Sequence, residues 1–426
     1  MAEDKFQVII IGAGVAGSSA AYRLAKAGVE VMVVERGSEP GSKNMTGGRL
    51  YTHALEQLMP NEWREAPLER EITREMMMMM TAENSMSIDS LFPSMNQQSY
   101  SVLRAKFDPW LAAKAEEEGA MIIPGTTVDG LIIRDGKVCG IKTGEEEIEA
   151  DLVISAEGVN AIVAERAGLI KTPDVKDMAV GVKYVYQLSE DIINERFNTE
   201  SGKGTALLCA GDCTKGISGG AFLYTNEDSI SVGLVVDSNG WKKSKLPLAD
   251  IAEEFKMHPA ISRYIEGGEL IEYSAHVIPE GGIHSIPPLC KNGFMITGDA
   301  AGLVVNRGFT VRGMDYAILS GIAAAETAIE AIEANDYSSN FLNRYESKLE
   351  LVLKDLKTFK NSHDYIGHSQ HLFTTYPDLA TSLMKNLYSV DSNPTPSVMN
   401  VVKQSIKGKV PIFSVVKDAI KGGKAL

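Results

Sequence analysis

The chain has 426 residues, of which 44% are apolar and 23% are charged. This balance is that of a folded globular protein of two or three domains, and it excludes wholesale disorder. With 42 basic and 56 acidic residues the formal net charge is −14, which argues against a nucleic-acid binder, because such proteins need clustered positive charge. The charge is uneven, since residues 401–426 carry six lysines and one acid, Asp418.

Cysteine usage and hydropathy indicate the cellular compartment in which the protein works. The four cysteines, Cys139, Cys209, Cys213 and Cys290, are too few and too scattered for a disulfide framework, so we expect a reducing compartment. No stretch approaches the roughly 20 apolar residues that span a bilayer. The acidic start with its short apolar run is unlike a signal peptide. We therefore expect a cytoplasmic protein.

The N-terminal residues predict a strand, a glycine turn, a helix and a second strand. Residues 8–11 are a β-branched run, typical of a parallel strand buried on both faces. A Gly-x-Gly-x-x-Gly turn at residues 12–17 then opens a helix of small residues that ends near Gly28. The second strand occupies residues 29–34 and ends at Glu35.

This glycine pattern has a mechanism in its strand–helix context. Gly12 permits the tight turn, Gly14 lets the backbone approach a pyrophosphate, and Gly17 lets helix and strand pack closely. The pyrophosphate would lie over the helix N-terminus. Glu35, 18 residues after Gly17, can accept hydrogen bonds from ribose hydroxyls. An acid at this position disfavours a 2′-phosphate and leaves FAD or NAD rather than NADP.

The remaining chain predicts further loops, helices and strands. We expect a loop at 37–48, a helix over 53–75, and a buried strand or a pliable contact surface at the five methionines 76–80, with the strand favoured. A helix is expected at 107–119, followed by short strands over 121–154 with an Asp135-Gly136 hairpin. Residues 178–285 predict a mostly antiparallel sheet with a turn at 225–228 and one helix near 249–258. A strand at 294–297 and a long helix at 313–334 come next, and then polar helices that are interrupted at 408–411.

A downstream element distinguishes FAD from NAD. Gly298-Asp299-Ala-Ala-Gly302 follows a strand, opens toward a helix, and resembles an element of FAD enzymes of the p-hydroxybenzoate-hydroxylase-like class. In that class the aspartate meets the ribityl–pyrophosphate region and the next helix N-terminus faces the flavin. Arg104 and the turn ending at Gly158 match two further elements of that class. The simpler interpretation, that Gly298-Asp299 is only a helix N-cap, is the less favoured one.

Three longer stretches carry a closer resemblance. Residues 41–51, 273–282 and 306–315 resemble the FixC branch of the electron-transfer-flavoprotein:quinone oxidoreductase family, and the similarity runs end to end. It implies an FAD protein that receives electrons from an electron transfer flavoprotein of FixA/FixB type. It would pass them, with a FixX-type ferredoxin partner, toward a quinone or a low-potential acceptor.

The cysteines depart from the larger eukaryotic relatives, which carry an iron–sulfur domain. Cys209-x-x-x-Cys213 is more simply structural, because a cubane cluster needs four converging thiolates. A cluster must therefore come from another polypeptide or not be used at all.

Pattern and resemblance together predict an α/β fold. It comprises an FAD-binding Rossmann-like (p-hydroxybenzoate-hydroxylase/glutathione-reductase-like) domain, an antiparallel-sheet cap domain and a helical C-terminal extension. We expect the discontinuous FAD domain to be formed by residues 1–75, 101–175 and 286–335, the cap by 76–100 and 176–285, and the extension, with its basic tail, by 336–426.

The resemblance also implies the cofactor site. The expected FAD-binding residues are Gly12, Ala13, Gly14, Gly17, Glu35, Arg36, Lys43, Gly47, Gly48, Arg104, Val128, Gly158, Gly298, Asp299, Gly302, Arg312 and Gly313. Lys43, Gly47 and Gly48 would line the isoalloxazine. We expect no catalytic side chain, because the flavin holds the redox chemistry. We expect no metal site either, because His363 and His368 fall on different helical faces.

The basic tail has two interpretations. Its six lysines interleave with Ile412, Phe413, Val415, Val416 and Ile420, which on a helix gives an apolar stripe beside cations. This suits anionic lipid headgroups, on the cytoplasmic face of the inner membrane, or an acidic partner. Alternatively, the tail is a solvated helix packed on the domain. We favour a docking surface, because the rest of the chain is acidic.

Two rival functions stay open at this point. The fold also hosts small-molecule flavoenzymes, such as a geranylgeranyl-reductase-like reductase or a hydroxylase. A third possibility, behind the electron relay as the leading hypothesis, is an assembly subunit whose FAD is structural.

Overall fold

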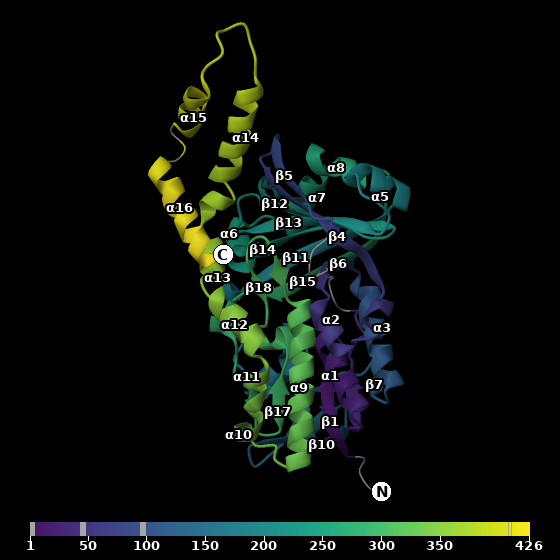
Figure 1. The fold of residues 1–426 in the computed structure, drawn as a ribbon. Coiled ribbons are helices and arrows are strands. Elements are labelled where there is room, and N and C mark those ends of the chain that lie inside the picture. Colours follow the sequence, from purple (N-terminus) through teal and green to yellow (C-terminus); the bar gives the residue numbers. More distant parts are fainter. Residues whose placement is uncertain (1–4, 43–47, 94–98, 408, 410) are drawn as a thin grey trace.

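Two β-sheets and a helical extension organise the molecule (Figure 1). The computed structural model describes residues 5–42, 48–93, 99–407, 409 and 411–426. In Figure 1 the first sheet lies in the lower half and the second in the upper half, while the C-terminal helices run along one side of both.

The eight-stranded sheet contains five parallel strands. In spatial order these are β17 (Phe294–Ile296), β10 (Glu146–Ser155), β1 (Phe6–Ile11), β2 (Val31–Val34) and β7 (Met121–Ile123). An antiparallel strand, β16 (Cys290–Lys291), flanks β17, and the hairpin β8 (Gly130–Arg134) and β9 (Lys137–Thr143) pairs with β10. The hairpin turns at Asp135-Gly136, both with positive φ, as predicted.

Helices α1 (Val15–Lys26), α3 (Arg104–Glu117) and α9 (Met314–Ala334) lie side by side in front of this sheet (Figure 1). Small residues bring α1 and α9 together, because a Cβ on Gly321 would lie only 2.5 Å from the carbonyl oxygen of Ala16. The helices predicted at 107–119 and 313–334 are thus confirmed.

The nine-stranded sheet is mostly antiparallel. Its order is β15 (Glu269–Pro279), β11 (Met178–Gln187), β14 (Ser229–Asp237), β13 (Gly219–Thr225), β12 (Lys203–Gly211), β4 (Leu68–Met80), β6 (Ser99–Val102) and β3 (Gly48–Tyr51), and β5 (Ser85–Leu91) pairs with β4. The β12–β4 pair is parallel. One face packs against α5 (Glu190–Phe197), α7 (Leu248–Met257) and α8 (Pro259–Ile265) in a core of its own.

Two sequence-based expectations about this region are wrong. Only α2 (His53–Leu58) and a short 3₁₀ turn are helical within 53–75, and β4 already begins at Leu68. Its charged residues find partners on neighbouring strands, such as Lys203 for Glu71 at 2.5 Å, which lie too far along the chain to be seen locally. Residues 178–285 also contain four helices, α6 (Ser238–Ser244) among them, rather than one.

The five methionines form the end of β4, so the favoured strand interpretation is confirmed. Met76, Met78 and Met80 are buried in the core of the nine-stranded sheet. Met77 and Met79 lie on the opposite face and line a cavity. The alternation of side chains along a strand therefore gives the run two roles.

The extension beyond α9 is helical, as expected. It contains α10 (Ser339–Leu342), α11 (Arg344–Lys348), α12 (Glu350–Thr358), α13 (Ser362–His368), α14 (Thr375–Tyr388), α15 (Val398–Ile406) and α16 (Ile412–Ala425). The division into domains at the expected boundaries stays a prediction. The nine-stranded sheet draws in β3, β6 and the first half of β4 as well as residues 76–91.

Arg70 provides a test of how the nine-stranded sheet is held together. This residue of β4 is only 1% exposed, and its guanidinium donates to the carbonyl oxygens of Asn226, Glu227 and Lys203 and to Asn194 Oδ1. Arg70→Lys cannot serve all four acceptors, and we expect it to destabilise the protein by about 3 kcal/mol. Chemical denaturation measures the effect, and Arg134→Lys at an exposed ion pair is the matched control. Equal stability of the two variants would contradict this role.

Candidate functional site

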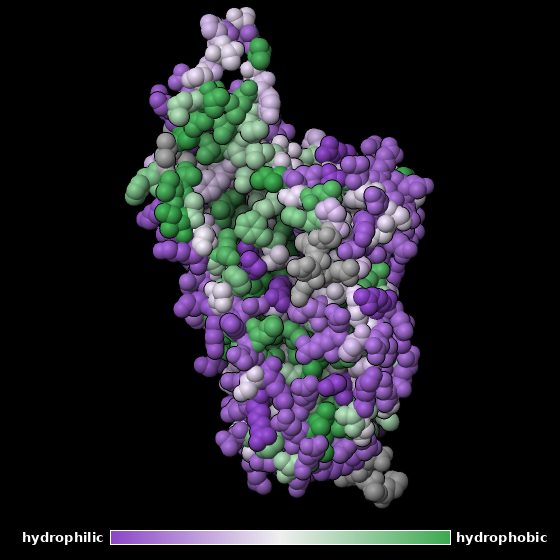
Figure 2. All heavy atoms as spheres, viewed as in Figure 1, coloured by the Kyte–Doolittle hydropathy of each residue, from purple (hydrophilic) through white to green (hydrophobic). Residues whose placement is uncertain are grey.

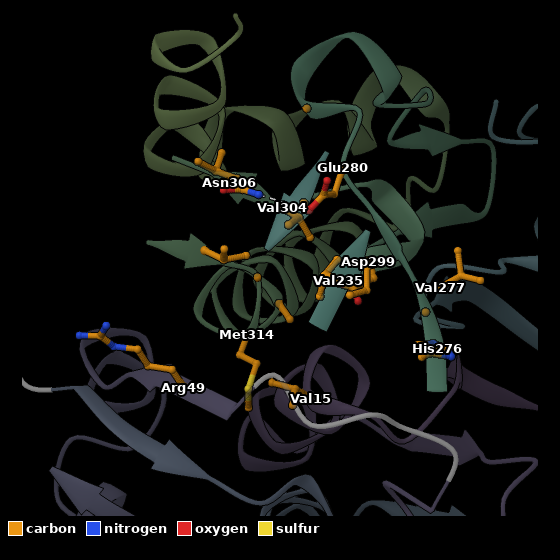
Figure 3. A pocket seen from close by; sticks show the side chains of 18 of the residues that line it. Val15, Arg49, Val235, His276, Val277, Glu280, Asp299, Val304, Asn306 and Met314 are labelled. Atoms are coloured by element: carbon orange, nitrogen blue, oxygen red, sulfur yellow. Dashed lines mark hydrogen bonds between the residues drawn. The ribbon is translucent and has the colours of Figure 1, made fainter. Parts of the chain in front are cut away.

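A cavity of about 880 Å³ is lined by both sheets (Figure 3). Strands β1, β2, β10 and β17 run parallel, so the residues that follow them meet at one edge of the sheet. Gly12 after β1, Glu35 after β2, Gly158 after β10 and Asp299 after β17 all line the cavity from this edge. The order of strands thus explains why residues almost 300 positions apart share one site.

The glycine turn leaves its backbone open toward the cavity. Gly12 has a φ of +102°, and a Cβ there would lie 2.4 Å from the carbonyl oxygen of Ala156. A Cβ on Gly17 would lie 1.9 Å from the carbonyl oxygen of Gly12, so only glycine permits this packing. Gly14 is the N-cap of α1 and provides no side-chain cap. The first N–H groups of α1 are therefore available to an anion.

Glu35 is held rigidly at the end of β2. Its carboxylate accepts hydrogen bonds from the backbone N–H of Ala13 at 2.9 Å and of Gly37 at 2.7 Å. The acid therefore fixes the glycine turn and still has lone pairs for a further donor. Arg36 beside it is exposed and also lines the cavity.

Charged groups from three elements line the cavity and act on one another. Arg104, at the start of α3, binds Asp108 with hydrogen bonds of 2.5 and 2.6 Å. Burial raises the pKa of the Asp299 carboxyl, against the positive charges of Arg104 and His276. Burial also lowers the pKa of His276, against the charge of Asp299. Among the described residues the Asp299 carboxylate has no hydrogen-bond donor, whereas its backbone carbonyl oxygen accepts from the N–H of Gly302 at 3.0 Å. The carboxylate therefore remains an acceptor for a ligand hydroxyl.

A large part of the cavity lining is apolar. The inner face of the nine-stranded sheet and the C-terminal helices supply its side chains, which include Met77, Met79, Leu208, Phe222, Val235, Phe359, Ile366, Leu372, Phe373 and Leu426. We call this part the apolar arm. It joins the polar edge without a dividing wall, because all these residues line the same cavity.

The predicted site residues fall into three groups. The residues that line the cavity are Gly12, Gly14, Glu35, Arg36, Arg104, Val128, Gly158, Asp299 and Gly313. Those that do not line it are Ala13, Gly17, Gly48, Gly298, Gly302 and Arg312. Lys43 and Gly47 lie outside the described residues. The assignment of the set to FAD stays a prediction at the level of single residues.

Several residues outside the cavity lining have structural tasks. A Cβ on Gly48 would meet the ring of Tyr224 at 2.5 Å, and one on Gly298 would meet Ala16 of α1 at 2.8 Å. Gly302 adopts a φ of +70° where the 3₁₀ turn Gly298–Ala301 ends. These glycines let neighbouring elements approach the site.

The side chain of Arg312 does not line the cavity and binds two carboxylates instead. Its guanidinium donates to Asp315 at the start of α9 and, at 2.6 Å, to Asp355 of α12. His53 Nε2 of α2 lies 3.2 Å from both Arg312 and Asp315. The neighbouring Gly313, the N-cap of α9, lines the cavity instead.

Several side chains that also line the cavity had no role predicted from the sequence, among them Arg49, Tyr224, His276, Glu280 and Asn306. All of these except Tyr224 lie within the stretches that carry the family resemblance, which was the only signal available. Arg49 is fixed by Glu75, with bonds of 3.1 and 2.5 Å, across two strands that are distant in sequence.

Comparison with known proteins identifies the family. Three family models match: "FAD binding domain" over residues 5–212, "ETF-QO, ubiquinone-binding" over 178–278, and "ETF-QO/FixC family C-terminal domain" over 363–426. Protein FixC of Escherichia coli (strain K12) is 44% identical over 426 residues, 99% of each chain. The chain belongs to the ETF-QO/FixC family. The predicted family and the predicted cofactor, FAD, are therefore confirmed, and the protein is an FAD-dependent oxidoreductase.

Further relatives agree with this assignment. The probable electron transfer flavoprotein-quinone oxidoreductase YdiS of E. coli (strain K12) is 44% identical over 431 residues, with full coverage of both chains. A geranylgeranyl bacteriochlorophyll reductase-like protein from Thermoplasma acidophilum has the same fold, with a TM-score of 0.72, 23% identity, and coverage of 98% of this chain and 99% of that one. The predicted α/β FAD-binding fold is thus confirmed.

The Glu35 carboxylate allows a test of the cofactor site in this ETF-QO/FixC family member. Glu35→Ala removes a charged acceptor for a ribose hydroxyl and the two bonds that fix the glycine turn. A charge-assisted hydrogen bond contributes about 1.5–3 kcal/mol, so we expect FAD affinity to fall by about 10- to 100-fold while the fold is kept. Flavin absorbance after dialysis and far-ultraviolet circular dichroism measure the two quantities. Glu39→Ala, at an exposed residue nearby, is the control; full FAD retention by Glu35→Ala would refute the assignment.

Proposed function

We propose that this oxidoreductase receives electrons from a reduced electron transfer flavoprotein of FixA/FixB type and passes them to a quinone. The observation that carries the proposal is the continuity of the cavity, whose polar edge suits FAD and whose apolar arm suits a quinone ring with its isoprenoid tail. Leu208, Phe222 and Val235 of this arm lie within the residues matched by the ubiquinone-binding model.

Different residues of the polar edge would hold different parts of FAD. The N-terminus of α1, with Gly12, Gly14 and the packing of Gly17, would hold the pyrophosphate, Glu35 the ribose, and Asp299 a ribityl hydroxyl. Bound FAD supplies the redox chemistry, since its ring system takes up and releases electrons.

Other residues would serve the flavin end of the site. Gly313 opens the N-terminus of α9 toward the cavity, where backbone N–H groups favour negative charge. Arg312 would act indirectly, because Asp315 and Asp355 hold its guanidinium. Lys43 and Gly47 complete the proposed set.

A second surface supports contact with lipid. Exposed apolar side chains gather over α14–α16, where Figure 2 shows several groups of hydrophobic residues. These residues, the C-terminal apolar surface, are Leu387, Tyr388, Val390, Val398, Met399, Phe413, Val416 and Ile420. All six lysines of the tail are exposed on the same helices or the turns between and after them. None of the helices in the described part of the chain is both long and apolar enough to traverse a bilayer.

This combination suits peripheral binding to anionic lipid. Apolar side chains enter the headgroup boundary while nearby lysines meet lipid phosphates. Contact of the C-terminal apolar surface with a membrane would also bring the apolar arm toward lipid-dissolved quinone, since Leu426 at the end of the tail lines that arm.

A FixX-type ferredoxin is the proposed partner that carries an iron–sulfur cluster. Cluster ligands are thiolates, but burial raises the pKa of Cys213 to about 12 and raises that of Cys209 as well. Cys290 is also buried, and its Sγ lies 2.9 Å from Asn343 Oδ1. These thiols are suited to packing rather than to cluster ligation.

Anaerobic stopped-flow mixing tests the electron relay. We expect the absorbance of bound FAD to bleach rapidly with reduced electron transfer flavoprotein and to recover with a soluble quinone analogue, because the donor supplies electrons that the quinone removes. The chain alone should not oxidise NADH or NADPH. Rapid substrate-stimulated NADPH oxidation would indicate a small-molecule flavoenzyme instead. A flavin that no donor reduces would indicate a structural role.

Charge reversal on the tail tests the lipid contact. Each lysine near an anionic surface contributes about 1 kcal/mol, so the double variant K417E/K421E should bind phosphatidylglycerol vesicles at least 30-fold more weakly, by about 2 kcal/mol. The control K242E/K243E changes two exposed lysines of α6 and should bind as the unaltered protein does. Cosedimentation gives both values, and equal effects of the two variants would argue against a local docking surface.

A further inference from the structure

A carboxyl group enters the cavity where β15 ends. Glu280 follows Pro279, the last residue of that strand, and its side chain lies beside Val304 and Asn306 in Figure 3. Its backbone N–H donates to the carbonyl oxygen of Asp177 at 2.8 Å. The next residue, Gly281, packs so closely that a Cβ there would lie 2.7 Å from Asp177 Cβ. The chain at Glu280 and Gly281 therefore packs directly against the 3₁₀ turn Val175–Asp177, and this contact fixes the position of Glu280.

The surroundings of this carboxyl favour retention of a proton. Asn306 Nδ2 donates to Glu280 Oε1 at 3.3 Å, and no lysine or arginine in the described part of the chain forms an ion pair with it. Burial raises the pKa of Glu280, and the negative charge of Asp237 at the end of β14 adds to the rise. The hydrogen bond from Asn306 and the charge of His363 on α13 oppose it.

A partly exposed imidazole lines the same cavity as this carboxyl. His363 lines the cavity and its side chain is 26% exposed. Its Nε2 lies 4.0 Å from Oδ1 of Asp177, which is 23% exposed and belongs to the turn that holds the Glu280 backbone. His363 is thus a partly exposed group of the cavity wall whose charge acts on Glu280.

We propose that Glu280 is the proton donor to a quinone oxygen in this cavity. This proposal rests on the proposed function. Reduction of a quinone to a quinol forms two O–H bonds and requires two electrons and two protons. Both electrons and one proton come from the reduced, singly protonated flavin, which becomes the oxidised flavin. The second proton leaves Glu280 as its O–H bond breaks, and Glu280 takes another from the His363 imidazolium, which regains one from water.

The alternative role for Glu280 is structural, namely to hold Asn306. Glu280→Gln separates the two roles, because the amide oxygen still accepts from Asn306 Nδ2 but the side chain carries no acidic proton. Glu280→Asp keeps an acid at a shorter reach. Glu269→Gln makes the same chemical change at an exposed residue of the same strand and is the matched control.

The decisive measurement is the reoxidation of photoreduced holoprotein by a soluble short-chain quinone, followed anaerobically over a pH series. In the unaltered protein we expect the rate to fall as the pH rises through the raised pKa of Glu280, because only the protonated acid donates. Glu280→Gln should be slower by about 100-fold and should lose this pH dependence, in keeping with general-acid catalysis. Glu280→Asp should regain part of the rate and the pH dependence. An unchanged rate and pH profile in Glu280→Gln would overturn the proposal.

A spectroscopic measurement is independent of turnover. Infrared difference spectra of the holoprotein across the same pH range should show a protonated carboxyl C=O band that is absent in Glu280→Gln and present in Glu269→Gln. A band that persists in Glu280→Gln would assign the titrating acid elsewhere and count against the proposal. His363→Gln should keep the band and slow only repeated turnovers, because it removes the resupply of protons.

Failure of the proposed function would look different. Photoreduction removes the need for any electron transfer flavoprotein, so a faulty donor assignment leaves this test intact. If photoreduced, unaltered protein is not reoxidised by quinones, the acceptor assignment fails and the proton-donor role falls with it. If it is reoxidised and Glu280→Gln matches it, only the role of Glu280 fails.

Discussion

The absence of side chains at two glycines is the constraint on which the rest of the structure depends. The carbonyl oxygen of Gly12 occupies the space of a Cβ on Gly17, and the carbonyl oxygen of Ala156 occupies that of a Cβ on Gly12. The turn, the start of α1 and the end of β10 can therefore touch. This contact places the free N–H groups of α1 at the edge where four parallel strands end, and it lets Ala13 reach the Glu35 carboxylate.

The nine-stranded sheet completes the site because its two faces differ. One face is buried under helices, whereas the other contributes Met77, Met79 and Phe222 to the cavity. Alternation along each strand divides the same short segments between stability and binding. The charged groups Arg104, Asp299 and His276 line the same cavity, so one space offers both polar and apolar walls.

The sequence predicted those parts of the molecule whose signals are local. The glycine turn, the Asp135-Gly136 hairpin and the Ala-rich helix α9 each carry their information within a few residues. The first half of β4 does not, because its charged side chains are stabilised by partners such as Lys203, more than a hundred residues away. A charged segment without visible partners suits a helix equally well, which explains the error over 53–75.

The same reasoning applies to the site. Residues that directly follow the parallel strands were predictable, because strand order brings them to one edge. Side chains from the second sheet, such as Arg49 and His276, were not, because their place depends on register between strands distant in sequence. Arg312 is the opposite case, a residue that was predicted for the site but does not line the cavity. Its motif lies beside the cavity, but its guanidinium binds Asp315 and Asp355.

The C-terminal helices connect the surface of the molecule to its interior. The side chain of Leu426, which follows α16, lines the cavity, and a Cβ on Gly308 would lie 3.6 Å from its Cδ1. Phe413 on the same helix is 80% exposed. Helix α16 thus exposes an apolar side chain to solvent near its start, while the residue that follows it lines the apolar arm. Under the proposed function this arrangement matters energetically, because a quinone that moved from lipid to the arm would stay in apolar surroundings, and the cost of exposing its tail to water would be avoided.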